Sequence, residues 1–267
     1  QIFSRWLRWM ICLCEFEMPP PRSDSARSLS KCGDAKKIWG GMTRVGAHVK
    51  LERGGIMILY HGSPNKIVVP TFGLGEERHD YGKGFYLTAD LNLAKEWAVC
   101  RPESESGFVH SFELDTDGLE IFDFEKENIL CWLSELMKHR AAADSKRYRV
   151  LAEKFIAKYG KDTSDADVIK GWRANASYFY IAKAFVRDEV DIDILEELMQ
   201  LGGLGIQWCL KSEKAYAHLK NLDEIIPVDY HEFNAKYNER DSKARINMMA
   251  LIDSDKNNVE KVFSTLV

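Results

Sequence analysis

The order of hydrophobic patterns along the chain limits its fold more than any other sequence feature. Short strand-like runs come first, at residues 58–61, 85–88 and 108–114. From about residue 127 to about residue 201, the apolar residues recur instead at the three-to-four spacing of helices. A compact apolar run at 206–210 then resumes the strand pattern. This order predicts an α+β fold in which a helical insertion separates the strands of one domain.

Individual elements follow from the same patterns. Thr88 or Asp90 can cap a helix at 91–100, and Ser212 a helix at 213–219, because their side-chain oxygens accept hydrogen bonds from free backbone N–H groups. Pro227 makes the last strand an edge candidate, since proline cannot donate to a ladder. Further helices are expected at 127–140, 146–159, 174–187, 192–201 and within 230–267, and further strands at 67–69, 119–122 and 225–228.

Residues 1–55 differ from the remainder, with three consecutive prolines from Pro19 and no sustained periodicity. The tetrapeptide at 52–55 can be encoded by a purine-rich stretch that resembles a ribosome-binding site, just before Met57. One hypothesis is that 1–55 are translated leader and Met57 is the natural start; a disordered tail is the alternative. The predicted organisation is this segment, a domain at 56–230 with a helical insertion at about 125–202, and a helical extension at 231–267.

Composition excludes several classes of protein. The net charge is −4 and the pI about 6.0, so no overall positive field attracts nucleic acid, although a local basic groove remains compatible. No apolar run approaches the ~20 residues that a membrane helix needs. The six cysteines form no Cys-x-x-Cys pair and show no metal-ligand spacing. We therefore expect a cytoplasmic protein that neither spans a membrane nor binds a metal.

Two short segments carry residues suited to NAD⁺ chemistry. One ends the first strand with His61, Gly62 and Ser63; the other leads through Gly84 to Tyr86, and Trp97 follows on the next predicted helix. Cleavage of the nicotinamide–ribose bond needs an aromatic face for the pyridinium ring and a partner for the ribose hydroxyls. It also needs backbone amides beside a glycine for the carboxamide, since glycine permits close approach. Together the segments predict an NAD⁺ site.

These segments resemble the ADP-ribosyltransferase superfamily, on the side of diphtheria toxin and the poly(ADP-ribose) polymerases. His61-Gly62-Ser63 is similar to the strand that binds the nicotinamide ribose and carboxamide there. Gly82-Lys83-Gly84-Phe85-Tyr86 is similar to the strand with the first stacking tyrosine, and Trp97 stands eleven residues on, at the place of the second. The resemblance implies split antiparallel sheets with a helical insertion and C-terminal helices.

A closer resemblance is to a bacterial family of this superfamily, catalogued as a domain of unknown function. Two positions depart from what the resemblance implies. Gln207 stands where the superfamily often has glutamate, and an uncharged amide stabilises a ribose cation less. Asn175 and Ala176 stand where acidic residues are expected. The motifs span residues 57 to about 230: Leu59-Tyr60-His61-Gly62-Ser63, Tyr81 to Thr88, Trp172-Arg173-Ala174, Ser177-Tyr178-Phe179, Leu204-Gly205-Ile206-Gln207 and Leu210 to Ala215.

The resemblance implies a mono-ADP-ribosyltransferase with catalytic His61, Tyr86 and Gln207. It would transfer ADP-ribose from NAD, with no metal, to a protein or nucleic-acid acceptor. A role as a bacterial toxin or defence protein is implied as well, and the run Met248-Met249-Ala250-Leu251-Ile252 is a candidate surface for an antitoxin or immunity protein.

Other interpretations stand beside this one. Gln207 and Asn175-Ala176 favour a catalytically inactive module of the same fold that binds NAD, another nucleotide or a partner. A transferase acting on RNA 2′-phosphates is a third interpretation, which the pI disfavours. His61 can also be a structural histidine, and Tyr86 and Trp97 can be core aromatics.

Overall fold

The computed structural model describes residues 55–100, 106–140, 146–174, 181–182, 184–200, 203, 205–255 and 263–266. The chain divides into two units, residues 1–49 and residues 50–267, and the description below concerns the second. The segment expected as leader or disordered tail thus lies outside the described residues, except for Gly55. Asn175, Ala176 and the motif at 177–179 lie outside them too.

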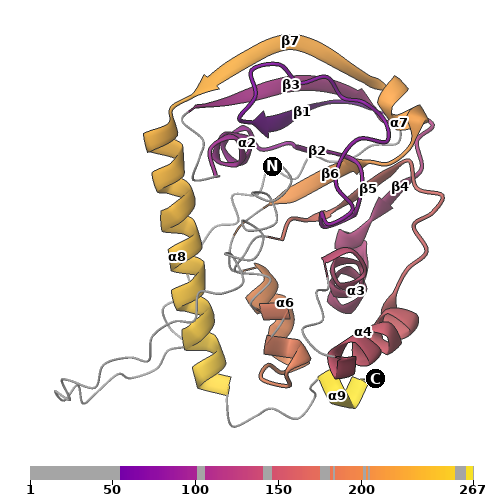
Figure 1. Ribbon diagram of the computed structural model, residues 1–267, viewed down its shortest axis with the longest axis vertical. Coiled ribbons are helices and arrows are strands. Elements are labelled where there is room, and N and C mark those ends of the chain that lie inside the picture. The colour runs from indigo at the N-terminus through magenta and orange to yellow at the C-terminus, as the bar shows by residue number, and fades with distance from the viewer. Residues whose placement is uncertain are drawn as a thin grey trace, which may run out of the picture. The chain divides into compact units, whose positions relative to one another are not determined.

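Seven strands form one mixed sheet in the order β4-β5-β6-β2-β1-β3-β7 (Figure 1). Neighbouring strands are antiparallel except β4 and β5, which run parallel. The helices in the connection between them provide the crossover that a parallel pair needs. The strands are β1 (Ile56–Ser63), β2 (Phe85–Thr88), β3 (Gly107–Asp115), β4 (Ile121–Asp123), β5 (Val168–Trp172), β6 (Ile206–Leu210) and β7 (Leu219–Val228).

The two halves of the sheet meet at a weak junction between β1 and β2. β1 pairs with β3 along its whole length, whereas its ladder with β2 has one register pair, Tyr60↔Thr88. The α+β class is confirmed. Split antiparallel sheets were expected, whereas the structure has one seven-stranded sheet, in which β4 pairs with β5 in parallel. β7, which contains Pro227, is an edge strand as predicted.

The hydrophobic pattern does not predict β5, since Lys170 and Gly171 interrupt any apolar alternation. Packing explains the glycine: a Cβ on Gly171 would lie 2.9 Å from Phe124 Cβ and closer still to the Tyr81 hydroxyl. The strand expected at 67–69 does not form, and this segment lies in the loop after β1. Of the segment expected as a helix at 174–187, the described residues 181–182 and 184–186 are helical, whereas Ala174 is not and Arg187 lies in a turn.

The helices occupy most of the expected segments, and two predicted caps are confirmed. α2 (Leu91–Ala98) begins after Asp90, whose carboxylate accepts from two backbone N–H groups of its first turn. α7 (Glu213–Ala217) begins after Ser212, whose hydroxyl accepts from the Ala215 N–H. The others are the 3-10 helix η2 (Phe124–Lys126), α3 (Ile129–Arg140), α4 (Lys146–Tyr159), α6 (Ile192–Gln200), α8 (Tyr230–Asp255) and α9 (Phe263–Leu266).

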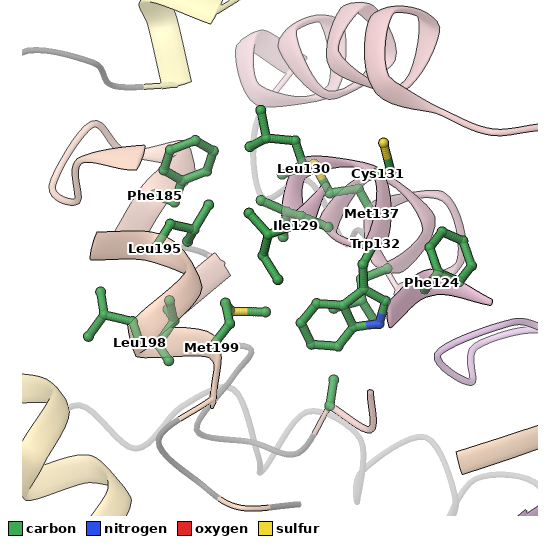
Figure 2. Packing of buried hydrophobic residues seen from close by; sticks show 14 of the residues in the cluster. Phe124, Ile129, Leu130, Cys131, Trp132, Met137, Phe185, Leu195, Leu198 and Met199 are labelled. Carbon is green, nitrogen blue, oxygen red and sulfur yellow. The ribbon is translucent and has the colours of Figure 1, made fainter. Parts of the chain in front are cut away.

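Hydrophobic side chains pack on both faces of the sheet. The larger cluster includes Trp132 and Leu195, and Figure 2 shows side chains of α3 and α6 pointing toward one another. The second cluster contains Leu59 of β1. β6 contributes to both, because Trp208 points into the second cluster and Cys209 into the larger one.

The long C-terminal helix α8 has 26 residues, many of them charged. Among the described residues, no helix combines the length and apolar character needed to cross a bilayer. The run considered as an antitoxin surface lies on α8. Met248 is buried in the larger cluster and Leu251 and Ile252 pack against it, so most of this run has an internal partner, whereas Met249 is exposed.

Candidate functional site

His61 lies near the end of β1 with a fixed imidazole. Its Nδ1 is 2.7 Å from the backbone carbonyl oxygen of Tyr86, and its ring stacks on Phe85 with 4.5 Å between centroids. A carbonyl oxygen can only accept, so the proton is assigned to Nδ1, and Nε2 presents its lone pair. Burial lowers the pKa of His61 to about 4, which keeps the ring neutral at pH 7. Nearby, the buried Ser63 hydroxyl accepts from the Asn65 N–H at 3.1 Å.

The imidazole of His61 and the phenol of Tyr86 point to opposite faces of the sheet. The register of β1 and β2, with the alternation of side chains along a strand, places His61 on the face of Phe85. Tyr86 packs against the larger hydrophobic cluster on the other face. Because β2 pairs Thr88 with Gln207, this second face carries both Tyr86 and Gln207. The structure thus places the side chains of Tyr86 and Gln207 on one face of the sheet. The His61 side chain lies on the other face, and its contact with Tyr86 is at the backbone carbonyl oxygen.

The glycines of both motifs are explained by packing within the protein. A Cβ on Gly62 would lie 2.8 Å from the Ala98 backbone nitrogen and closer still to the Ala94 carbonyl oxygen, both on α2. A Cβ on Gly84 would lie 2.6 Å from the Leu210 carbonyl oxygen on β6. These residues let a helix and a strand approach closely. Their lack of a side chain is therefore not independent evidence of a ligand.

Tyr86 anchors the glycine turn that precedes β2. Its hydroxyl donates to the Gly82 carbonyl oxygen at 2.6 Å and accepts from the Tyr81 N–H at 3.1 Å. Gly82 adopts a φ of 71°, which favours glycine, and the His139 ring lies directly against it. Burial raises the pKa of Tyr86 well above its ordinary value, so the phenol stays protonated. The ring edge also contacts His79, with 5.3 Å between centroids.

Gln207 belongs to a buried polar network centred on Asp80. Its Nε2 donates to Asp80 Oδ2 at 2.8 Å and to the Trp172 carbonyl oxygen at 3.2 Å. Asp80 also accepts from the Ala174 N–H at 2.8 Å and forms an ion pair with Arg140. A glutamate at 207 would set a second carboxylate against Asp80. The network therefore explains why an amide stands at this position.

Sequence reasoning missed Asp80, because an acidic residue in a charged loop has the signature of a solvated side chain. Its partners come from segments far apart in the chain, since Arg140 follows by 60 residues and Gln207 by 127. No local pattern in the sequence could have paired them.

The Trp97 ring lies against Arg173, a residue to which the sequence analysis assigned no role. The Arg173 guanidinium carbon lies 4.2 Å from the centroid of the Trp97 ring, so one face of the indole is occupied. Both side chains retain partial exposure. A nicotinamide ring could stack only on the other face. The role of Trp97 in holding nicotinamide remains a prediction.

Two of the three described thiols are buried with raised pKa values, and the third donates a hydrogen bond to the backbone of Trp97. Burial raises the pKa of Cys209 to about 12, so its thiol is protonated at pH 7. Cys131 is buried as well, with a raised pKa, and Cys100 is half-buried with its thiol bonded to the Trp97 carbonyl oxygen. No group of three or more His, Cys, Asp or Glu side chains suited to a metal ion occurs among the described residues.

A polar cavity of about 320 Å³ lies beside α3, and none of the predicted NAD⁺-site residues lines it. It opens near the buried Glu135, which accepts from His139 at 2.9 Å. The lining residues are Glu135, Lys138, His139, residues 162–167, Lys211 and Ser212.

One family model matches the chain over residues 57–221, which is more than half of its length, and its description is "Protein of unknown function (DUF3990)". No curated protein matches the chain, and no solved structure does. The match begins within β1 and ends within β7, so it includes every motif residue described above. The chain therefore belongs to the DUF3990 family, a family of unknown function.

Proposed function

We propose that this protein is an NAD⁺-dependent mono-ADP-ribosyltransferase whose site lies where β1 and β2 separate. One observation carries the proposal: the His61 imidazole is neutral, and the Tyr86 carbonyl oxygen fixes its tautomer and orientation. Its Nε2 is then an acceptor of the kind that a ribose hydroxyl requires. The fold proposed for this site is that of the ADP-ribosyltransferase superfamily. The adjacent order β6-β2-β1, which carries Gln207, Tyr86 and His61, supports it.

The reaction breaks the bond between nicotinamide and ribose C1′. Nicotinamide leaves with the electron pair of that bond, and the ribose acquires oxocarbenium character. A lone pair of the acceptor then attacks C1′, and the acceptor's proton passes to solvent. His61 would hold a ribose hydroxyl while Tyr86 and Trp97 offer aromatic surface for the nicotinamide. Since His61 and Tyr86 point to opposite faces, a ligand would have to contact them beyond the end of the β1–β2 ladder, which has a single register pair.

Turnover by this site would be slow. Gln207 carries no charge, and its amide donates to Asp80, whose own charge is paired with Arg140. The oxocarbenium therefore gains less electrostatic stabilisation than a free carboxylate at position 207 would provide. A role as a bacterial toxin or defence protein acting on a protein or nucleic-acid acceptor is part of the proposal.

Labelled NAD⁺ incubated with cell lysate tests the proposal. Transfer of label is expected with the unmodified chain and is expected to be abolished by His61→Ala. His231→Ala, an exposed histidine on α8, is the matched control and should transfer label normally. Separate protease and nuclease digestion would then identify the acceptor class. Undiminished transfer by His61→Ala would refute the assignment.

A second candidate is a catalytically inactive module that binds NAD or another nucleotide. The hydrogen bond from Gln207 to Asp80 favours this module, because the Gln207 amide already has a partner within the protein. Calorimetry with NAD⁺, followed by chromatography for free nicotinamide, separates the two. Binding without nicotinamide release supports the module, and release supports the enzyme.

A further inference from the structure

Arg173 carries an enclosed donor without a protein partner. It follows β5, and its Nη1 is buried without a hydrogen-bond partner; the neighbouring Trp97 Nε1 is in the same state. Within the described part of the chain, no carboxylate lies within ion-pairing distance of Arg173. Burial lowers the pKa of this guanidinium, although the nearby Asp80 acts in the opposite direction. Leaving such donors unpaired is costly, so they indicate a missing acceptor.

The two nearby buried carboxylates each form an ion pair with another arginine. Asp80 pairs with Arg140, and Glu96 of α2 pairs with Arg240 of α8, with 2.9 Å from Arg240 Nε to Glu96 Oε2. Each of these carboxylates is buried and has its own arginine. Neither carboxylate forms an ion pair with Arg173, so its positive charge has no counter-charge in these pairs. An anion would balance it.

The stacking geometry specifies the kind of anion. The Arg173 guanidinium carbon lies over the Trp97 ring, and the N–H groups of a guanidinium all lie in its own plane. A planar fork of donors matches two oxygens of a phosphate group. Trp97 Nε1 supplies another donor close by. Both residues retain partial exposure, although the two unpaired nitrogen atoms themselves are buried, so a ligand would have to displace the groups that cover them.

We propose that Arg173 and Trp97 form a binding site for a phosphate group, with Arg173 as its principal donor. The source of that phosphate rests on the proposed function, under which it is the pyrophosphate of the nucleotide. The anion site itself does not rest on it. Trp97 thereby gains a binding role as a donor at its edge, in addition to any stacking on its open face.

Calorimetry on the full chain tests this site with two probes, sodium pyrophosphate and ADP-ribose, at constant ionic strength. The variants are Arg173→Met, which removes the charge and keeps bulk, and Arg173→Lys, which keeps the charge and loses the planar fork. Arg245→Gln is the control, since Arg245 is exposed and pairs with Asp241 one helical turn away. At least one probe is expected to bind the unmodified chain and Arg245→Gln equally. Both Arg173 variants are expected to bind at least about tenfold more weakly.

The two probes separate the sources of the anion. Binding of pyrophosphate supports a site for the free anion, whereas binding of ADP-ribose alone supports a nucleotide site. If neither probe binds the unmodified chain, the proposal is overturned. It is equally overturned if a folded Arg173→Lys or Arg173→Met binds as tightly as the unmodified chain.

The unfolding midpoint without ligand serves as the fold control. Removing a poorly compensated buried charge is expected to leave the midpoint of Arg173→Met no lower than that of the unmodified chain. Arg173-dependent binding without NAD⁺ cleavage would support the site and not the enzyme. NAD⁺ cleavage by a chain that binds neither probe would support the enzyme and refute the anion site.

Discussion

Replacement of Gly62 by alanine tests whether α2 or a ligand explains the glycine of the first motif. The new Cβ would lie 2.8 Å from the Ala98 backbone nitrogen and closer still to the Ala94 carbonyl oxygen. Both are backbone atoms of a helix, so no side-chain rotation can relieve the overlap. Gly55→Ala is the matched control, because a Cβ there has no neighbour within 4 Å.

The two substitutions should differ by several kcal/mol in the free energy of unfolding. Overpacking a well-packed core costs about 1–3 kcal/mol, and a rigid backbone obstacle places Gly62→Ala near the upper value. In open space the same change stabilises by up to about 1 kcal/mol, since it reduces the entropy of the unfolded chain. The expected difference between the variants is therefore about 3–4 kcal/mol.

Urea unfolding followed by tryptophan fluorescence measures this difference. A loss of about 3 kcal/mol lowers the midpoint by roughly 1–2 M at a slope of about 2 kcal/mol/M, and the slope should not change. If Gly62→Ala is within about 1 kcal/mol of Gly55→Ala, α2 does not approach β1 as described. The packing explanation of Gly62 would then be wrong.

The remaining predictions concern the polar groups of the site. The pKa of His61 is about 4 in the folded chain against an ordinary value of 6.5, so the unfolded chain binds the extra proton between these values. Stability should therefore decline as pH falls from about 6.5 to 4, by up to about 3 kcal/mol, and urea midpoints of His61→Gln should show a flatter pH dependence. Gln207→Glu should lower the thermal midpoint at pH 7, because it sets a second carboxylate against Asp80. The difference in midpoint between the variant and the unmodified chain should become smaller at pH 5. A difference that is the same at both pH values would contradict this. Tyr86→Phe should cost about 1–3 kcal/mol in urea unfolding, because two backbone groups lose their buried partner. Tyr60→Phe is its control, and equal losses in both would count against the anchor.

Elements with local causes could be predicted from the sequence. The caps at Asp90 and Ser212 depend on side chains within three residues of the N–H groups they accept. Short apolar runs between turn residues indicate the strands β1, β2 and β6. No such run indicates β5, because its Gly171 is required by the Tyr81 hydroxyl, which lies 90 residues earlier in the chain.

The candidate site shows the same division. The sequence alone determined that His61 and Tyr86 stand on neighbouring short strands, and that Gln207 stands on a buried one. Only the tertiary structure decided that register turns the His61 ring away from the Tyr86 phenol, and that Asp80 accepts from the amide of Gln207. Hydrogen-bond partners and strand faces are set by which distant segments meet. Local propensity carries no information about that.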